Sequence, residues 1–241
     1  MMIDICLPVY NEQNILQKNT LHIFEFCKKQ NWPFDWQIVI IVNGSVDKSL
    51  QIAKELAGNY LQIIAVNYEA SGKGNAIKEY GLISKADIMV YMDIDLSTDL
   101  KDLPELIEQI TKHDYDLAIG SRLMPGSITK RSFLRELISR SYNLLSRILL
   151  NNNISDMQCG FKAVRITVFH KVAAYIQDTK WFFDTELVVF TKLLNYAIKE
   201  VPVNWSENRY EKRKSTIRLG KDSCQLLISL IKLKKRLSKI D

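Results

Sequence analysis

Cysteine, histidine, glycine and proline are all scarce in this sequence. The 241 residues include four cysteines, three histidines, nine glycines and five prolines. The cysteines form no Cys-x-x-Cys pair and the histidines do not cluster, so neither a zinc site nor a disulfide framework is indicated. Free thiols are typical of a reducing cytosol. The few glycines and prolines also exclude a fibrous chain.

Long hydrophobic runs are absent as well. Runs such as residues 38–42 are far shorter than the roughly 20 apolar residues that a bilayer-spanning helix needs. Residues 3–7 indicate a strand rather than a signal peptide. We therefore expect a protein that does not cross a membrane. With 47% hydrophobic and 25% charged residues, the composition is that of a folded globular protein, of one large domain or a domain with an appendage.

Positive charge is concentrated at the C-terminal end. Residues 209–241 carry 11 Lys and Arg against three Asp and Glu, a balance of +8, whereas the first 208 residues carry 22 and 24, a balance of −2. This difference divides the chain into a main domain over residues 1–208 and a basic segment over 209–241. Such a segment attracts phosphate groups of lipid or nucleic acid, although a solvated basic helix explains the charge equally well.

Short runs rich in β-branched residues alternate with amphipathic segments over the first half of the chain. Strands are expected over residues 3–9, 37–42, 61–66, 88–92 and 117–119. Helices are expected over residues 15–29, from residue 47 onward, and over 75–84 and 103–111. This βαβα order predicts an α/β fold with a mostly parallel central sheet flanked by helices.

Two amphipathic helices are expected in the second half, over residues 133–150 and 223–240. The second has one apolar stripe, formed by Leu226, Leu230, Leu233, Leu237 and Ile240, with Lys and Arg on its other side. An apolar stripe beside a basic face is typical of a helix lying on a membrane surface. An ordinary helix packed on the core or on a second subunit has the same pattern, and the sequence leaves these alternatives open.

Polar residues follow the expected strands, where ligands bind in open α/β sheets. Asp93-Ile94-Asp95 follows the fourth strand, and two carboxylates one residue apart are hard oxygen ligands suited to Mg²⁺ or Mn²⁺. Lys73, between Gly72 and Gly74 ahead of a helix, adds a cation and open backbone N–H groups for a phosphate. Each motif alone could be an ordinary turn or helix cap. Together they indicate a phosphate-binding edge.

The order of these motifs resembles that in family 2 glycosyltransferases of the GT-A fold. The resemblance rests on residues 7–12, 43–47, Gly72-Lys73-Gly74, Asp93-Ile94-Asp95, Gly120-Ser121-Arg122, 156–162 and 181–187. Gly120-Ser121-Arg122 and residues 156–162, together with residues 181–187, resemble the branch that makes polyprenyl-phosphate sugars, which includes dolichyl-phosphate β-glucosyltransferases and mannose synthases. The match spans roughly residues 3–220. It implies a GT-A catalytic domain over residues 1–208, followed by a basic loop and an amphipathic helix that contacts a membrane surface or a second subunit.

The resemblance implies an inverting transfer of a hexose from a nucleotide-diphosphate sugar to a polyprenyl or dolichyl phosphate. UDP-glucose is the favoured donor and GDP-mannose the alternative. Asp95 is implied as the principal ligand of Mg²⁺ or Mn²⁺, with Asp93 beside it. The residues implied to contact the nucleotide sugar are Pro8, Tyr10, Glu12, Asn43, Ser45, Lys73, Asp93, Ile94, Asp184 and Glu186. Many relatives have Asp where this chain has Asn43, which leaves the nucleobase open.

The acceptor needs cations more than it needs a base. A lipid phosphate has a second pKa of about 6, so it is already anionic near neutral pH. The transfer step then mainly requires that the lipid phosphate is positioned and that its repulsion from the donor diphosphate is relieved. Arg122 and Arg131 are expected to supply this charge, with Arg213 and Lys214 in reserve. Asp156, in the family's sugar- or acceptor-facing segment, is expected to orient the sugar or the acceptor.

Other functions fit the sequence less well. No Gly-x-Gly-x-x-Gly follows the first strand, as a nicotinamide dehydrogenase would require. A phosphate- or nucleic-acid-binding protein without catalysis would leave Asp93 and Asp95 unexplained, since carboxylates repel a phosphate backbone. A family 2 transferase that uses a glycan or protein acceptor is the nearest alternative. We expect a cytoplasmic protein that binds peripherally to the cytoplasmic face of a membrane through its basic tail, and no nucleic-acid partner.

Overall fold

A seven-stranded sheet forms the centre of the protein. The computed structural model describes the backbone of residues 1–207 and 219–239, and the side chains of all of these except 219–224. The strand order is β3-β2-β1-β4-β7-β5-β8. The strands are β1 (Met2–Val9), β2 (Asp35–Asn43), β3 (Ile63–Tyr68), β4 (Ile88–Tyr91), β5 (Leu117–Ser121), β7 (Lys162–Arg165) and β8 (Ile198–Pro202). A second, two-stranded sheet pairs β6 (Ile128–Lys130) with β9 (Asn204–Ser206).

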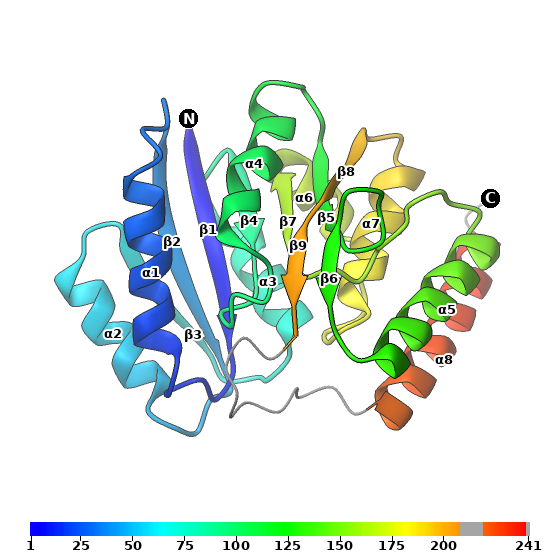
Figure 1. Ribbon diagram of the computed structural model, residues 1–241, viewed down its shortest axis with the longest axis horizontal. Helices are drawn as coiled ribbons and strands as arrows, with labels where there is room; N and C mark the ends of the chain where they lie inside the picture. The colour runs from blue at the N-terminus through cyan, green and yellow to red at the C-terminus, as the bar shows by residue number, and fades with distance from the viewer. Residues whose placement is uncertain (208–218, 240–241) are drawn as a thin grey trace.

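Helices cover both faces of the large sheet (Figure 1). They are α1 (Leu16–Lys28), α2 (Ser49–Asn59), α3 (Lys73–Ile83), α4 (Leu103–Thr111), α5 (Phe133–Leu149), α6 (Ile166–Ala173), α7 (Phe183–Leu193) and α8 (Leu219–Leu237). Side chains alternate between the two faces of a strand. In β1, Ile3, Ile5 and Leu7 therefore join a core with α1, α2 and α4, whereas Cys6 joins a second core with α3, α6 and α7. This three-layer arrangement confirms the expected fold class.

One strand runs against the others. The pairs β1–β2, β1–β4, β2–β3 and β5–β8 are parallel, but β7 is antiparallel to both β4 and β5. Because β7 runs the opposite way, its N-terminal end, at Lys162, pairs with Tyr91, the last residue of β4. The loop that precedes β7 is thereby brought to the edge of the sheet where the parallel strands end.

The C-terminal helix α8 packs beside α5 (Figure 1). The apolar stripe of α8 faces the protein: Leu230 and Leu233 are buried, and Leu226 and Leu237 pack against the second core. Of the alternatives that the sequence left open, the structure therefore favours packing on the core for these four leucines, because α5 and the second core already cover them. Ile240 lies outside the described residues.

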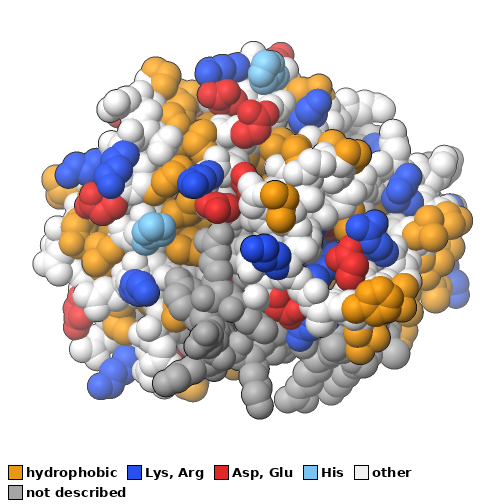
Figure 2. Space-filling model, viewed as in Figure 1, with side chains coloured by type: hydrophobic (Ala, Val, Ile, Leu, Met, Phe, Trp, Pro, Cys, Tyr) orange, Lys and Arg blue, Asp and Glu red, His pale blue; other side chains and the backbone are white. Residues whose placement is uncertain are grey.

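The outer face of α5 is apolar and open to solvent. Six large side chains of this helix are exposed: Phe133, Leu134, Leu137, Leu144, Leu145 and Ile148. In Figure 2, apolar side chains gather over α5 at the right of the molecule. We call these six residues the α5 face. No helix in the described part of the chain combines the length and the apolar character needed to cross a bilayer.

Candidate functional site

The acidic pair lies where β4 ends. Because β1, β2 and β4 are parallel, the segments that follow them emerge at the same edge of the sheet. Asp93 is the second residue after β4, and its side chain is 44% exposed. Asp95 is half-buried, and one of its carboxylate oxygens accepts a hydrogen bond from Ser97 N at 3.0 Å. Both carboxylates therefore lie at the surface of the expected ligand-binding edge, and neither is enclosed in the core.

Lys73 joins this acidic pair from the first turn of α3. Its Nζ atom lies 2.6 Å from Asp93 Oδ1, and only 10% of its side chain is exposed. Burial lowers the pKa of Lys73, but the charge and hydrogen bond of Asp93 together with the nearby charge of Asp184 outweigh that effect, so the pKa lies above its ordinary value and the ammonium stays protonated. Gly72 precedes it with φ of +143°, and a Cβ there would lie 2.4 Å from Thr179 O. Only glycine fits at this position.

A backbone segment that was not among the predicted site residues lies directly against this ion pair. A Cβ added to Gly160 would stand 2.3 Å from Lys73 Nζ and 2.7 Å from Asp93 Oδ2. Any side chain at Gly160 would therefore displace Lys73 or Asp93. The signal was present in the sequence, as the glycine of Cys159-Gly160-Phe161, but nothing in its spacing connects it to residues 73 and 93.

Arg122 is held by a buried carboxylate. Its Nε atom donates to Asp156 Oδ2 at 2.6 Å, Nη2 donates to Oδ1 at 2.9 Å, and its backbone N donates to Oδ2 at 3.1 Å. Asp156 is fully buried. Burial raises the pKa of Asp156, but the Arg122 charge and hydrogen bonds outweigh that effect and hold the pKa below its ordinary value. Asp156 thus positions Arg122, and the expectation that it faces the sugar or acceptor is not met.

Trp205 of β9 lies close to two arginines. Its ring centroid is 5.7 Å from Arg122 Cζ and 5.9 Å from Arg131 Cζ. Arg131 donates from Nε to Glu136 Oε2 at 2.5 Å, while its Nη2 atom is buried and has no hydrogen-bond partner among the described residues. The two expected phosphate-binding cations therefore stand near one aromatic ring. Trp205 was not among the predicted site residues, because β9 has only three residues and no motif marks it.

The residues expected around the nucleoside lie after β1 and β2, but they differ in exposure. Tyr10 is 49% exposed, Pro8 is half-buried, and Ser45 accepts a hydrogen bond from Asn11 N at 3.0 Å. Asn43 is buried: its Nδ2 donates to Val9 O at 2.9 Å, and its Oδ1 accepts from Gly72 N at 3.1 Å. Asn43 therefore fastens the ends of β1 and β2 to the Gly72 turn. The remaining expected residues, Glu12 and Ile94, are half-buried and buried, respectively.

Two carboxylates of α7 are not available to a ligand. Asp184 and Glu186 are each only 3% exposed. Asp184 accepts hydrogen bonds from Tyr91 Oη and Lys162 Nζ, and Glu186 accepts from the backbone N of residues 177 and 178 and from Arg236. In the described structure both carboxylates face internal donors, which does not support the expected contact with the sugar. Their charges are used inside the protein, where every carboxylate oxygen needs a donor.

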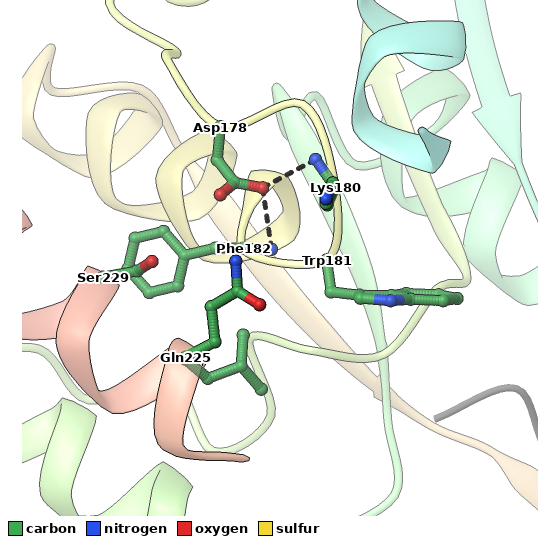
Figure 3. Close-up of a pocket in the computed structure, with 7 residues that line it drawn as sticks. Asp178, Lys180, Trp181, Phe182, Gln225 and Ser229 are labelled. Carbon is green, nitrogen blue, oxygen red and sulfur yellow. Dashed lines mark hydrogen bonds between the residues drawn. The ribbon is translucent and has the colours of Figure 1, made fainter. Parts of the chain in front are cut away.

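The loop before α7 borders a pocket against α8 (Figure 3). The pocket is lined by Asp178, Lys180, Trp181, Phe182, Gln225, Leu226 and Ser229. Asp178 Oδ1 accepts hydrogen bonds from Lys180 N at 2.7 Å and Phe182 N at 3.1 Å, which turns the loop. Trp181 and Phe182 extend to opposite sides (Figure 3). The Trp181 ring centroid is 5.8 Å from Lys73 Nζ, so this pocket adjoins the ion pair.

The carboxylates at this edge of the sheet fit a divalent cation that would take its remaining ligands from a bound diphosphate and water. The described residues contain no cluster of three or more His, Cys, Asp or Glu side chains able to enclose a metal. Asp93 and Asp95 supply two hard oxygen ligands, and Mg²⁺ commonly takes one or two carboxylates plus phosphate oxygens and water. Lys73, paired with Asp93, would meet the charge of the same diphosphate. Arg213 and Lys214, expected as reserve cations, lie outside the described residues.

Cys159 takes no part in nucleophilic chemistry. The side chain is buried, and burial raises the pKa of its thiol to about 12. A thiol with that pKa carries almost no thiolate near neutral pH. This agrees with the expectation that Cys159 is a small packing residue.

A family model and several known glycosyltransferases are similar to this chain in sequence. The family model of "Glycosyl transferase family 2" matches residues 4–173. Glycosyltransferase AglD of Haloferax volcanii is 33% identical over 205 residues, covering 84% of this chain and 33% of that protein. Dolichyl-phosphate β-glucosyltransferase of Dictyostelium discoideum is 28% identical, covering 91% of this chain and 72% of that protein. The enzyme of the same name from Saccharomyces cerevisiae is 27% identical, covering 85% of this chain and 67% of that protein.

The fold is found in solved structures too. Glucosyl-3-phosphoglycerate synthase from Mycobacterium tuberculosis, in complex with Mn²⁺, UDP-glucose and phosphoglyceric acid, superposes with a TM-score of 0.71. The identity is 17%, and the match covers 97% of this chain and 80% of that one. At this identity the likeness shows the fold alone. This chain spans about a third of the length of AglD and about 70% of the length of the two dolichyl-phosphate β-glucosyltransferases.

Proposed function

Since the chain belongs to glycosyl transferase family 2, we propose that it transfers a hexose, with inversion, from a nucleotide-diphosphate sugar to a polyprenyl or dolichyl phosphate. UDP-glucose is the favoured donor. The relatives named dolichyl-phosphate β-glucosyltransferase support this acceptor class. The observation that carries the proposal is the placement of Asp93 and Asp95 just after β4, at the ligand-binding edge of the sheet, with Lys73 paired to Asp93.

On the donor side, Asp95 and Asp93 would hold Mg²⁺ or Mn²⁺, which when bound would neutralise negative charge on the leaving diphosphate. Lys73 adds a second positive charge next to Asp93. Its ammonium is desolvated, so its attraction to a phosphate is stronger than it would be in water. The exposed Tyr10 and the half-buried Pro8 contribute a surface for the nucleoside.

On the acceptor side, Arg122 and Arg131 bind the lipid phosphate. An oxygen of this phosphate attacks the anomeric carbon, the bond from that carbon to the diphosphate oxygen breaks, and the nucleoside diphosphate leaves. Attack from the side opposite the leaving group inverts the anomeric configuration. The nucleophile is already anionic, so no side chain has to accept a proton. The buried Nη2 of Arg131 is a hydrogen-bond donor not used by the described residues.

We also propose that the catalytic unit, residues 1–208, acts at the cytoplasmic face of a membrane, and that residues 209–241 add basic charge to the same surface. The reduced thiols of Cys6, Cys27 and Cys159 agree with a reducing compartment. The α5 face offers the apolar area that a peripheral contact needs, and exposed Lys232, Lys234 and Lys235 of α8 provide attraction to anionic headgroups.

Charges placed on the α5 face should release the protein from lipid. We expect Leu144→Glu/Ile148→Glu to lower the fraction bound to vesicles that contain anionic lipid at least tenfold, because two exposed apolar side chains become anionic. Flotation of vesicles measures this. Leu61→Glu/Ile83→Glu is the matched control, since both residues are exposed but lie outside α5. Equal binding of the two double variants would contradict a membrane contact through α5.

A donor panel tests the proposed reaction. UDP-glucose, UDP-galactose, UDP-N-acetylglucosamine and GDP-mannose are each incubated with a short polyprenyl phosphate and Mn²⁺ or Mg²⁺. We expect one uridine donor, UDP-glucose, to give a lipid-linked hexose. Transfer from GDP-mannose instead would correct the donor. If no donor yields product with the lipid phosphate while a glycan or protein acceptor is glycosylated, the lipid acceptor is wrong and the alternative is right.

A further inference from the structure

Lys162 is a completely buried ammonium group. It begins β7, and its side chain has no exposure to solvent. Its Nζ atom donates to Asp184 Oδ1 at 2.5 Å and to Cys159 O at 2.5 Å. Asp184 Oδ1 also accepts a hydrogen bond from Tyr91 Oη at 2.7 Å. Lys162, Asp184 and Tyr91 therefore form one buried network that joins β7, α7 and β4, and none of the three is used in the proposed transfer step.

Two segments of the backbone connect this network to the acidic pair. Tyr91 is the residue of β4 that pairs with Lys162, and Asp93 is two residues further on. The carbonyl of Cys159, which Lys162 holds, belongs to the peptide that leads into Gly160. Gly160 is the backbone segment that lies against Asp93 and Lys73. A movement of the turn before β7 would therefore move the surface on which the Lys73–Asp93 ion pair rests.

The energetic cost of this arrangement indicates a role beyond holding the fold together. Taking two charges out of water costs several kcal/mol for each ion, and a buried ion pair often contributes no more stability than well-packed apolar side chains of similar volume. An apolar pair between β7 and α7 would maintain the packing of the second core. It could not hold the carbonyl of Cys159, because that oxygen needs a hydrogen-bond donor.

We propose that Lys162, Asp184 and Tyr91 are positioning residues: they fix the Cys159–Gly160 backbone against Asp93 and Lys73 and thereby set the affinity of the site for a divalent cation with a nucleoside diphosphate. The inference rests on the proposed function, because it takes that ligand class as given. None of the three side chains contacts the ligand. They act through Gly160, whose lack of a side chain lets the backbone approach the ion pair.

The deciding variant is Lys162→Met/Asp184→Asn, which removes both charges and nearly keeps the side-chain volumes. We expect this double variant to fold with a melting temperature near that of the wild type, and to bind UDP in the presence of Mn²⁺ at least tenfold more weakly by isothermal titration calorimetry. A purely structural network predicts the opposite: wild-type affinity once the charges are removed together. Wild-type affinity in the folded double variant would overturn the proposal.

A second pair of variants keeps the test decisive if the double variant fails to fold. Tyr91→Phe removes the hydroxyl donor to Asp184. Tyr80→Phe is its matched control, because Tyr80 Oη donates to the buried Asp4 Oδ2 at 2.6 Å, in a cluster toward the start of β1. We expect Tyr91→Phe to weaken the binding of UDP with Mn²⁺ three- to tenfold and Tyr80→Phe to leave it unchanged. Equal affinity in the two variants would overturn the positioning role.

The same measurements separate this inference from the proposed function. If the wild type binds UDP with Mn²⁺ but transfers no sugar to a polyprenyl phosphate, the lipid-acceptor function fails, and the positioning role is still decided by the binding data. If the wild type binds neither UDP nor GDP with Mn²⁺, both fail. If the wild type transfers the sugar and the folded double variant binds UDP as well as the wild type does, only the positioning role fails.

Discussion

The Asp95→Asn variant is expected to lose at least 100-fold in turnover while its melting temperature stays within a few degrees of the wild type. Asparagine keeps the shape of the side chain and can still accept the hydrogen bond from Ser97 N. It loses the negative charge that a divalent cation requires in a ligand set with only one other carboxylate, Asp93. Removing a group that stabilises transition-state charge lowers turnover by about 10²–10³. Initial rates of sugar transfer at saturating donor measure the effect.

The control for this variant lies at the other end of the same strand. Asp87 precedes β4, is exposed, and accepts a hydrogen bond from Met2 N at 2.7 Å. Asp87→Asn makes the same chemical change and should leave turnover unchanged. Addition of excess chelator to the wild type should reproduce the loss seen in Asp95→Asn. Full activity of Asp95→Asn, or full activity in chelator, would contradict a metal held by the acidic pair.

The regular part of the fold was predictable from the sequence because long elements carry a strong periodic signal. The helix expected over residues 103–111 is α4, and the helix expected over 15–29 is α1, shorter by one residue at each end. The strands that the sequence did not predict are short. β6 and β9 have three residues each and β7 has four. Over such lengths, pairing partners decide the structure, and the partners are distant in the chain.

The sequence was sufficient to predict which segments meet at the site. It was not sufficient to predict which of their side chains stay exposed to a ligand. Asp93 and Lys73 come together because parallel strands end at one edge, a rule that needs only the strand order. Whether an acidic residue in the first turn of α7 meets a ligand or a buried cation depends on what packs there. Asp184 meets Lys162 and Glu186 meets Arg236, contacts between residues 22 and 50 positions apart.

The C-terminal stripe illustrates the same limit. Periodicity places Leu226, Leu230 and Leu233 on one side of a helix, and an interfacial membrane helix and a core-packed helix have the same period. The pattern shows that the stripe needs an apolar neighbour but does not identify it. In the structure, that neighbour is the second core. The six exposed apolar side chains of the α5 face lie on a helix whose amphipathic spacing the sequence also showed, but the spacing alone did not indicate which side would stay exposed.

The Asp156→Asn variant should lose both stability and activity. The substitution leaves Arg122, whose side chain is 13% exposed, without a counter-charge in a buried position. Breaking a buried pair by removing one partner costs about 3–5 kcal/mol of unfolding free energy. Because Arg122 is then no longer held beside Trp205, transfer to the lipid phosphate should fall at least tenfold at saturating donor. Chemical denaturation and initial rates measure the two effects.

The loss of stability in Asp156→Asn should also depend on pH with a defined sign. The pKa of Asp156 lies below its ordinary value in the folded protein, so its contribution is fully present well above the unfolded value of about 3.9 and disappears as the pH falls through the folded pKa. The stability gap between wild type and variant should narrow between about pH 5 and pH 3. Glu108→Gln, which breaks the exposed pair with Lys112, should change stability by less than about 1 kcal/mol. A gap that stays constant down to pH 3 would show that the Asp156 carboxylate is not stabilised by Arg122.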